Sequence, residues 1–247
     1  MPIIEKYQDG VLYYQFKRIN DLKFIKHLFT SKIGWEYGNI LDKISDIFKA
    51  PRANIITVKQ VHGTDIMVID SKIQNYKNLS SIEADGLVTN IPNIILTTYH
   101  ADCVPVYFLD QAKKVIGIAH SGWRGTYANI TGNMIELMEE NYNSNKEYIV
   151  IGIGPSIGSC CYEVGKDLAD KFTERYPKFD NILVKKSGRV YLDLWKINYN
   201  QIREKGIPVD NIILSNICTS CKIDRFHSYR RERGTKNRMV AAIGLID

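Results

Sequence analysis

Two histidines and one cysteine stand out because each ends a β-like run at a small or polar turn. His62 follows Val-Lys-Gln-Val, Cys103 lies in Ala-Asp-Cys-Val-Pro, and His120 precedes Ser-Gly-Trp-Arg-Gly. Two imidazoles and a thiolate form a ligand set that leaves one tetrahedral position open, as in a catalytic zinc site. The same side chains also suit a thiolate nucleophile beside a histidine base. Both chemistries require a fold that brings the three together, because they lie too far apart in the chain for a compact metal finger.

The size and net charge of the chain limit the kinds of ligand and partner that it is expected to have. With 247 residues it can bury most of its apolar surface without covalent cross-links. The net charge of +6 is spread over Lys-rich patches along the chain and mildly favours anionic ligands. It falls short of the concentrated basic stripe of a nucleic-acid-binding protein. We therefore expect a small-molecule ligand and no nucleic-acid partner.

The cysteines and the first residues indicate the compartment. The five cysteines are odd in number and lack the dense, regular spacing of a small secreted scaffold. The first ten residues lack a basic start followed by an apolar core, and no apolar run is long enough to span a bilayer. We therefore expect a cytoplasmic protein without a membrane partner.

The elements that must position these residues are short strands and amphipathic helices. Strands are predicted over residues 10–16, 54–61, 94–98, 104–109, 115–119, 148–153, 211–214 and 239–246. Helices are predicted over residues 128–141, 166–176 and 194–205. Strands and helices alternate, without an internal repeat or a linker. We therefore predict one α/β domain over residues 1–247, with helices packed on a mixed β-sheet and the active site on strand-end loops.

Eight short motifs occur in the chain in the order found in one known family. They are Gln60-Val-His-Gly, Ala84-Asp-Gly-Leu-Val-Thr, Ala101-Asp-Cys-Val-Pro, Ala119-His-Ser-Gly-Trp-Arg-Gly-Thr, Gly154-Pro-Ser-Ile-Gly with Cys161-Tyr-Glu-Val-Gly, Tyr191-Leu-Asp-Leu, Cys218-Thr-Ser-Cys and Phe226-His-Ser-Tyr-Arg-Arg-Glu. Together they resemble the laccase-domain family. That family was first labelled polyphenol oxidases and is now described as zinc-dependent purine nucleoside phosphorylases that also deaminate adenosine.

The resemblance implies one zinc ion per chain, held by His62, Cys103 and His120. It implies phosphorolysis of adenosine, inosine and methylthioadenosine, with purine nucleoside and phosphate as ligands, and a deaminase activity. A zinc ion with an open position would lower the pKa of a bound water, and attack of the resulting hydroxide at C6 of a purine would give deamination. We expect a monomer or a small homo-oligomer.

Basic residues are the candidates for binding phosphate. Arg124, Arg230 and Arg231 are the first choice, because a guanidinium binds an oxyanion through two parallel hydrogen bonds. Lys32 stands in an altered early segment, where the family has an arginine in a loop that helps to form the substrate pocket. Asn237 lies where the family's closing Thr-Gly-Arg has glycine, and asparagine tolerates a positive φ better than most residues.

Two aspartates and the remaining histidines have less specific patterns. Asp85 and Asp102 each follow an alanine in a turn-like segment, and either could orient a ligand histidine or act as general acid or base. An aspartate beside a turn also commonly makes only a local cap or Asx-type bond. His27 and His227 are interpreted as hydrogen-bonded structural residues, and the role of His100 stays open.

The other cysteines have two possible roles. Cys218 and Cys221 have the spacing of half a zinc knuckle or of a redox pair, and Cys160 and Cys161 could complete a four-thiolate site. Vicinal cysteines rarely bind one structural zinc together, and a redox pair belongs at a helix start. We therefore expect these four to be buried free thiols.

Other functions stay open at this point. Cys103 as nucleophile and His120 as base would make a cysteine hydrolase or amidase, and a role in editing peptidoglycan precursors is a further family label. A copper polyphenol oxidase needs several copper ions and more ligands than the five histidines of this chain easily supply. A non-catalytic protein stabilised by a metal ion is the remaining class, and an open coordination position argues against it.

Overall fold

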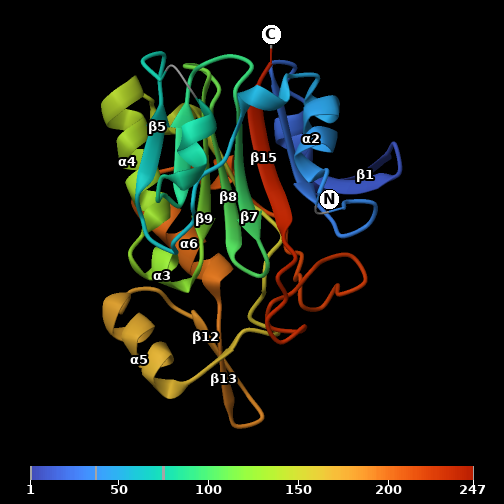
Figure 1. Cartoon of the computed structure of the whole chain (residues 1–247). Helices are drawn as coiled ribbons and strands as arrows, with labels where there is room; N and C mark the ends of the chain where they lie inside the picture. Colours follow the sequence, from blue (N-terminus) through green and yellow to red (C-terminus); the bar gives the residue numbers. More distant parts are fainter. Residues whose placement is uncertain (1, 37, 74–75, 247) are drawn as a thin grey trace.

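Two six-stranded β-sheets form the centre of the molecule in the computed structural model, which describes residues 2–36, 38–73 and 76–246. In spatial order, the first sheet contains β1 (Ile3–Gln8), β2 (Val11–Phe16), β3 (Ile25–Thr30), β15 (Met239–Leu245), β7 (Ile95–His100) and β4 (Ile55–Ile56). The second contains β14 (Ile212–Leu214), β10 (Ile149–Ile153), β8 (Val104–Asp110), β9 (Val115–Ser121), β6 (Gly86–Thr89) and β5 (Ile66–Ile69). A third, small sheet contains β11 (Glu163–Val164), β13 (Arg189–Leu192) and β12 (Leu183–Lys186). It projects beyond one end of the large sheets (Figure 1).

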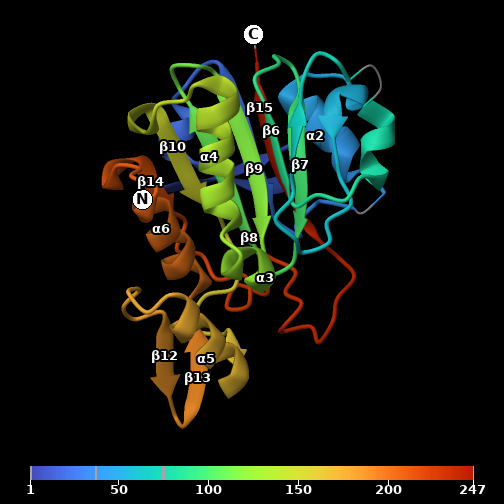
Figure 2. The same cartoon turned by 90° about the vertical axis from the view of Figure 1, so that its left-hand side faces the viewer.

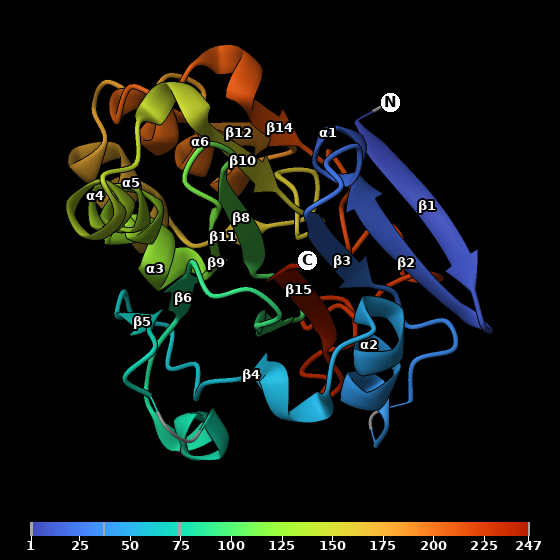
Figure 3. The ribbon, with the colours of Figure 1, turned by 90° about the horizontal axis from the view of Figure 1, so that it is seen from above.

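Helices cover the outer faces of both large sheets, which gives the molecule four layers. The helix α2 (Ile40–Phe48) packs on the first sheet, and α4 (Ile130–Tyr142) and α6 (Leu194–Glu204) pack on the second. Figures 2 and 3 show α4 and α2 on opposite sides of the pair of sheets. The remaining helical elements are α1 (Lys17–Asn20), α3 (Trp123–Tyr127), α5 (Lys166–Arg175) and the 3-10 helices η1 (Arg52–Asn54), η2 (Tyr76–Ser81), η3 (Lys146–Tyr148) and η4 (Val209–Asn211). No helix among the described residues is long and apolar enough to cross a membrane.

The strand β15 illustrates why these apolar runs form strands in the middle of the molecule. Met239, Ala241 and Ile243 face the core between the two large sheets, whereas Val240 and Ala242 join the cluster beneath α2. Successive side chains of a strand point to opposite faces, so a strand that is covered on both faces needs an unbroken apolar run. The whole of β15 is buried.

The predicted α/β class with mixed sheets and packed helices is confirmed. Parallel pairs (β5 with β6, β10 with β14, β4 with β7) occur beside antiparallel ones. The three successive strands predicted over residues 94–119 are confirmed, since β7, β8 and β9 follow one another there without a helix. The chain passes from the second sheet to the first and back at β7, and β8 and β9 are antiparallel neighbours, which need no crossover helix.

The strand predicted over residues 54–61 is also wrong, because only β4 and an isolated bridge at Lys59 form there. The side chain of Gln60 takes the place of a strand partner. Its Nε2 donates to the Tyr99 carbonyl oxygen at 2.9 Å, and its Oε1 accepts from the Tyr99 N–H at 2.7 Å. The main chain is thereby free to leave the sheet just before His62.

The strand register brings several chain segments to one edge of the molecule. Val104 at the start of β8 pairs with Ser121 at the end of β9, and Gly86 at the start of β6 pairs with Ala119. The parallel strands β10 and β14 have their carboxyl ends together. The turns that carry Asp85, Cys103 and the residues after β10 and β14 consequently meet at this edge.

Candidate metal centre and active site

His62, Cys103 and His120 come together at this edge. Their ligand atoms all lie within 4.8 Å of one another, and this group could hold a metal ion. Cys103 comes from the turn between β7 and β8, His120 from the last residues of β9, and His62 from the segment before β5. The imidazole rings of His62 and His120 meet edge to face, with their centroids 4.8 Å apart.

The fully buried carboxylate of Asp85 connects both histidines. Its Oδ1 accepts the backbone N–H of His62 at 3.0 Å and lies 2.8 Å from Nδ1 of His120. Its Oδ2 accepts the N–H groups of Val61 at 3.1 Å and Gly63 at 2.6 Å. Because Nδ1 of His120 is engaged in this way, Nε2 is the ring atom left for a metal ion.

Asp102 fixes the turn of Cys103 by a different set of contacts. Thr219 donates to its Oδ1 at 2.6 Å, while the hydroxyl of Ser228 and the backbone N–H of Arg230 donate to its Oδ2 at 2.9 and 2.7 Å. Asp102 and His62 have positive φ angles of 81° and 61°. Such backbone is costly for residues other than glycine, and hydrogen bonds to both residues hold it in place.

Gly122 allows the three ligands to approach one another. A Cβ atom at this position would lie 3.1 Å from Sγ of Cys103 and 3.2 Å from Cδ2 of His62. A side chain at this position would therefore require Cys103 and His62 to shift by a few tenths of an ångström. Glycine lets these residues keep their close approach.

The charges of the group favour a thiolate. Burial raises the pKa of the Cys103 thiol, but the charge and hydrogen bonds of His120 and His62 outweigh it and lower this pKa to about 6. Burial lowers the pKa of His120, whereas the Cys103 thiolate and Asp85 raise it to about 9. Burial also raises the pKa of Asp85, but hydrogen bonds from His120, Gly63 and Val61 lower it overall. The sulfur is thus in the form that binds metal ions.

Two other histidines, His100 and His27, are buried. They make structural hydrogen bonds and are not part of the group of His62, Cys103 and His120. Nδ1 of His100 donates to the Cys103 carbonyl oxygen at 3.1 Å, and its Nε2 lies 2.8 Å from the hydroxyl of Thr98. His100 therefore supports the turn that carries Cys103. For His27 the structural interpretation is confirmed, since it is buried and its Nε2 accepts the N–H of Phe16 at 2.7 Å.

A cavity of about 850 Å³ opens beside the metal-binding group and is lined by all three of its residues. Its wall contains four basic side chains, Arg124, Arg230, Lys236 and Arg238. Four aromatic side chains also line it, namely Tyr99, Trp123, Tyr162 and Tyr229. The arrangement can bind an anion and a planar ring next to a metal ion.

The predicted basic residues divide into two groups. Arg124 and Arg230 line the cavity, and their guanidinium carbons lie 4.4 Å from the ring centre of Trp123 and 5.1 Å from that of Tyr162. Arg231 and Lys32 are not among the described residues that line it. A role for those two in substrate binding stays a prediction.

Sequence reasoning missed Lys236 and Arg238. The segment before β15 carries two cations in four residues, which was a signal for an anion site. The expectation of a positive φ at Asn237 is wrong, because the left-handed residues of this loop are Arg233 and Gly234, with φ of 54° and 108°.

Known proteins are similar to this chain in sequence and in fold. A family model described as multi-copper polyphenol oxidoreductase laccase matches residues 39–246. The purine nucleoside phosphorylase YlmD of Geobacillus stearothermophilus is 34% identical over 208 residues, which cover 82% of this chain and 76% of that protein. A purine nucleoside phosphorylase of Borreliella burgdorferi is 31% identical over 231 residues, covering 92% and 94%. The crystal structure of YlmD from G. stearothermophilus superposes with a TM-score of 0.88 at 28% identity, covering 100% of both chains.

Proposed function

Because the chain belongs to the multi-copper polyphenol oxidoreductase laccase family, several of whose members are named purine nucleoside phosphorylases, we propose that it is a zinc-dependent enzyme of purine nucleosides. It phosphorolyses adenosine and inosine, and methylthioadenosine is a further substrate. The observation that carries the proposal is the convergence of His62, Cys103 and His120 beside a cavity with basic and aromatic walls.

The residues present fit a zinc ion. Two imidazoles and a thiolate are donors that zinc prefers, and they leave one tetrahedral position open. Asp85 fixes the tautomer of His120, as carboxylates commonly do for metal-binding histidines. A zinc ion held by His62, Cys103 and His120 would supply a Lewis acid in the wall of the cavity.

The cavity walls would hold the two substrates. In phosphorolysis a phosphate oxygen forms a bond to C1′ of the ribose as the bond from C1′ to the purine nitrogen breaks, and that nitrogen gains a proton. Arg124 and Arg230 would bind the phosphate through their guanidinium groups, helped by Lys236 and Arg238. Tyr162 would stack on the purine.

Asp102 is proposed as the group that moves the proton. Asp102 lines the cavity, and hydrogen bonds from Thr219 and Ser228 fix the orientation of its carboxylate. The same cavity would accept adenosine for deamination, in which water adds at C6 and ammonia leaves. Deamination needs no phosphate, so it should depend less on Arg124 and Arg230.

A cysteine hydrolase is the second candidate, because Cys103 with a pKa of about 6 lies beside His120 with a pKa of about 9. An editing enzyme for peptidoglycan precursors would use the same pair. Copper oxidation has less support, since the chain has five histidines and the ring nitrogens of His100 are both occupied.

Metal analysis paired with turnover tests the proposal. Protein purified without added metal is assayed with adenosine and inosine, with and without phosphate. We expect release of the free base only with phosphate, and loss of both turnover and one zinc ion in Cys103→Ala. His227→Gln, outside the metal-binding group, is the matched control. Full zinc retention in Cys103→Ala, or rapid alkylation of Cys103 in the metal-loaded protein with a trapped acyl-enzyme, would favour the hydrolase.

The phosphate site gives a separate prediction. Arg230→Lys should lower phosphorolysis roughly tenfold to a thousandfold, because a preorganised charge contact is lost. Zinc content should stay unchanged, and deamination should fall less. Equal loss of both reactions in Arg230→Lys and Arg124→Lys would place the phosphate elsewhere in the cavity.

A further inference from the structure

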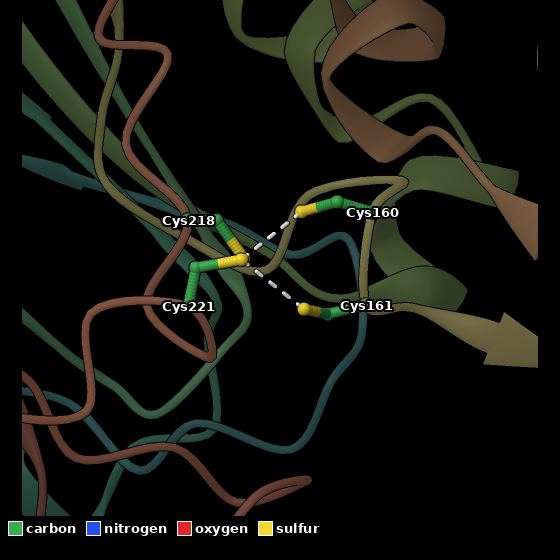
Figure 4. Close-up of side chains that lie close together, drawn as sticks. All are labelled: Cys160, Cys161, Cys218 and Cys221. Carbon is green, nitrogen blue, oxygen red and sulfur yellow. Dashed lines mark hydrogen bonds between the residues drawn. The ribbon is translucent and has the colours of Figure 1, made fainter.

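Four cysteine sulfurs converge at a second place on the same edge of the molecule, outside the group of His62, Cys103 and His120. The sulfurs of Cys160 and Cys161 each lie 3.4 Å from that of Cys221. With Cys218 they form a group whose ligand atoms are all within 4.8 Å of one another. Figure 4 shows the side chains of the two pairs pointing toward one another from separate loops.

The expectation that all four are buried is wrong, although Cys218 is buried and none of the four forms a disulfide. Cys160 and Cys221 are exposed, and the four side chains face each other. The physical reason is the parallel pairing of β10 with β14, which places the loops after their carboxyl ends side by side. An isolated bridge between Ser156 and Cys218 continues this pairing into the loops.

We propose that Cys160, Cys161, Cys218 and Cys221 bind a structural zinc ion that is distinct from the ion of the active site. A zinc–sulfur bond of about 2.3 Å in a tetrahedron places the sulfurs about 3.8 Å apart. The observed separations, 3.4 Å for two pairs and at most 4.8 Å for any pair, lie on both sides of that value. A cluster of several iron ions would hold its ligands further apart. Four protein ligands leave no open position, which is typical of a structural site.

The loop geometry explains how two adjacent cysteines take part. The N–H groups of Cys161 and Tyr162 both donate to the carbonyl oxygen of Gly158, at 2.9 and 3.0 Å, so the chain turns tightly at this point. The turn aims both sulfurs at Cys221 (Figure 4). In addition, the N–H of Gly158 donates to Sγ of Cys218 at 3.3 Å, a contact that stabilises a charged sulfur.

The ion would cross-link two walls of the cavity. Tyr162 follows Cys161 directly, and the guanidinium of Arg230 donates to the carbonyl oxygen of Glu163 at 2.7 Å. On the other loop, Thr219 follows Cys218 and donates to Asp102. The four-cysteine site thus lies between segments that hold Tyr162, Arg230 and Asp102. Its role is to fix the positions of these segments relative to one another. The site does not depend on which substrate the cavity binds.

Zinc stoichiometry tests the inference directly. The full chain is purified under reducing conditions, without added metal, and its zinc is measured against protein concentration. We expect about two zinc ions per chain in the wild type, and about one in either Cys221→Ser or Cys103→Ala. The combined variant should bind none. Lys222→Ala, an exposed neighbour of Cys221, is the matched control and should keep both ions.

Cobalt replacement gives a second readout, the visible absorption spectrum, which already reports a four-thiolate site in the wild type. A tetrahedral four-thiolate cobalt site absorbs strongly in the visible and near-ultraviolet range, more strongly than a site with one sulfur ligand. These bands should appear in the wild type, persist in Cys103→Ala and disappear in Cys221→Ser. Three results would each overturn the proposal. The first is iron in place of zinc, and the second is about one zinc in the wild type with four freely titrating thiols. The third is a disulfide at Cys221, seen as a loss of two hydrogen atoms in the intact mass.

Discussion

At the scale of single residues, Asp85 decides the geometry of the metal-binding group. Its two oxygens accept three backbone N–H groups and contact Nδ1 of His120, without any exposure to solvent. From its turn-like segment, Asp85 was expected to orient a ligand histidine or to act as acid or base. The contact to His120 agrees with the first role. No pattern predicted the three N–H contacts, because they depend on the left-handed backbone at His62.

We predict that Asp85→Asn weakens zinc binding at this site by roughly tenfold to a hundredfold. The amide keeps the size of the side chain but replaces one acceptor oxygen with a donor, which would face N–H groups. Competition with a chromogenic chelator measures the affinity. Asp70→Asn is the control, because Asp70 also accepts a backbone N–H, at 2.9 Å from Lys72, in another loop. Equal zinc affinity in the two variants would contradict the prediction.

His27 leads to a pH-dependent prediction. Burial, with a smaller contribution from Lys6, lowers its pKa to about 3, since Nε2 already accepts the Phe16 N–H and a second proton there would oppose it. The unfolded chain takes up that proton below pH of about 6.5. Stability linked to His27 is therefore complete above this pH and is lost as the pH falls toward 3, by up to about 5 kcal/mol.

Urea unfolding at about pH 7 and about pH 5 measures this loss. His27→Gln removes the titrating group, so its stability should fall less between the two pH values than that of the wild type. The same fall in both proteins would mean that His27 does not contribute.

At the scale of elements, the sequence predicted the strands and helices whose patterns follow from burial. The strands β8, β9, β10 and β15 were found because burial on both faces gives continuous apolar runs. The helices α4, α5 and α6 were found from their periodicity and caps. The sequence offered the four cysteines as a possible four-thiolate site, but it gave no reason to prefer that site over free thiols, because their convergence depends on β10 pairing with β14, two strands far apart in the chain.

The shortened strand before His62 gives a prediction at this scale. Gln60 replaces a main-chain partner by two hydrogen bonds to Tyr99, and so anchors the segment that carries His62. Gln60→Ala should leave the Tyr99 N–H and carbonyl without these partners and lower the free energy of unfolding by about 1 to 3 kcal/mol. Zinc affinity should fall as well, because His62 is no longer held.

Denaturant titration and chelator competition on Gln60→Ala measure the two effects. Gln111→Ala, in the turn after β8, serves as the control. A loss of stability with unchanged zinc affinity would show that Asp85 alone is sufficient to hold His62.

At the scale of the whole molecule, the prediction of one domain over residues 1–247 can be tested by unfolding. The core between the large sheets joins Leu12 and Tyr14 of β2 to Ala241 and Ile243 of β15. The small sheet with α5 projects from this core (Figure 1). We predict one cooperative transition in urea, with tryptophan fluorescence and far-ultraviolet circular dichroism coinciding.

The three tryptophans report on different layers, because Trp35 packs with α2, Trp123 lines the cavity and Trp195 lies on α6. A separate early transition seen by circular dichroism alone would indicate that the small sheet and α5 unfold independently.

The place of β15 has a consequence for how the protein is made. This strand lies between β3 and β7, to which it pairs along nearly its whole length, yet it follows both of them in the chain by more than a hundred positions. During synthesis on the ribosome, the edges of β3 and β7 that pair with β15 remain unpaired until β15 emerges. His62, Cys103 and His120 are all translated earlier, so a nascent chain holds the residues of this group before it can close the first sheet. Such a chain depends on protection of its exposed strand edges during that interval.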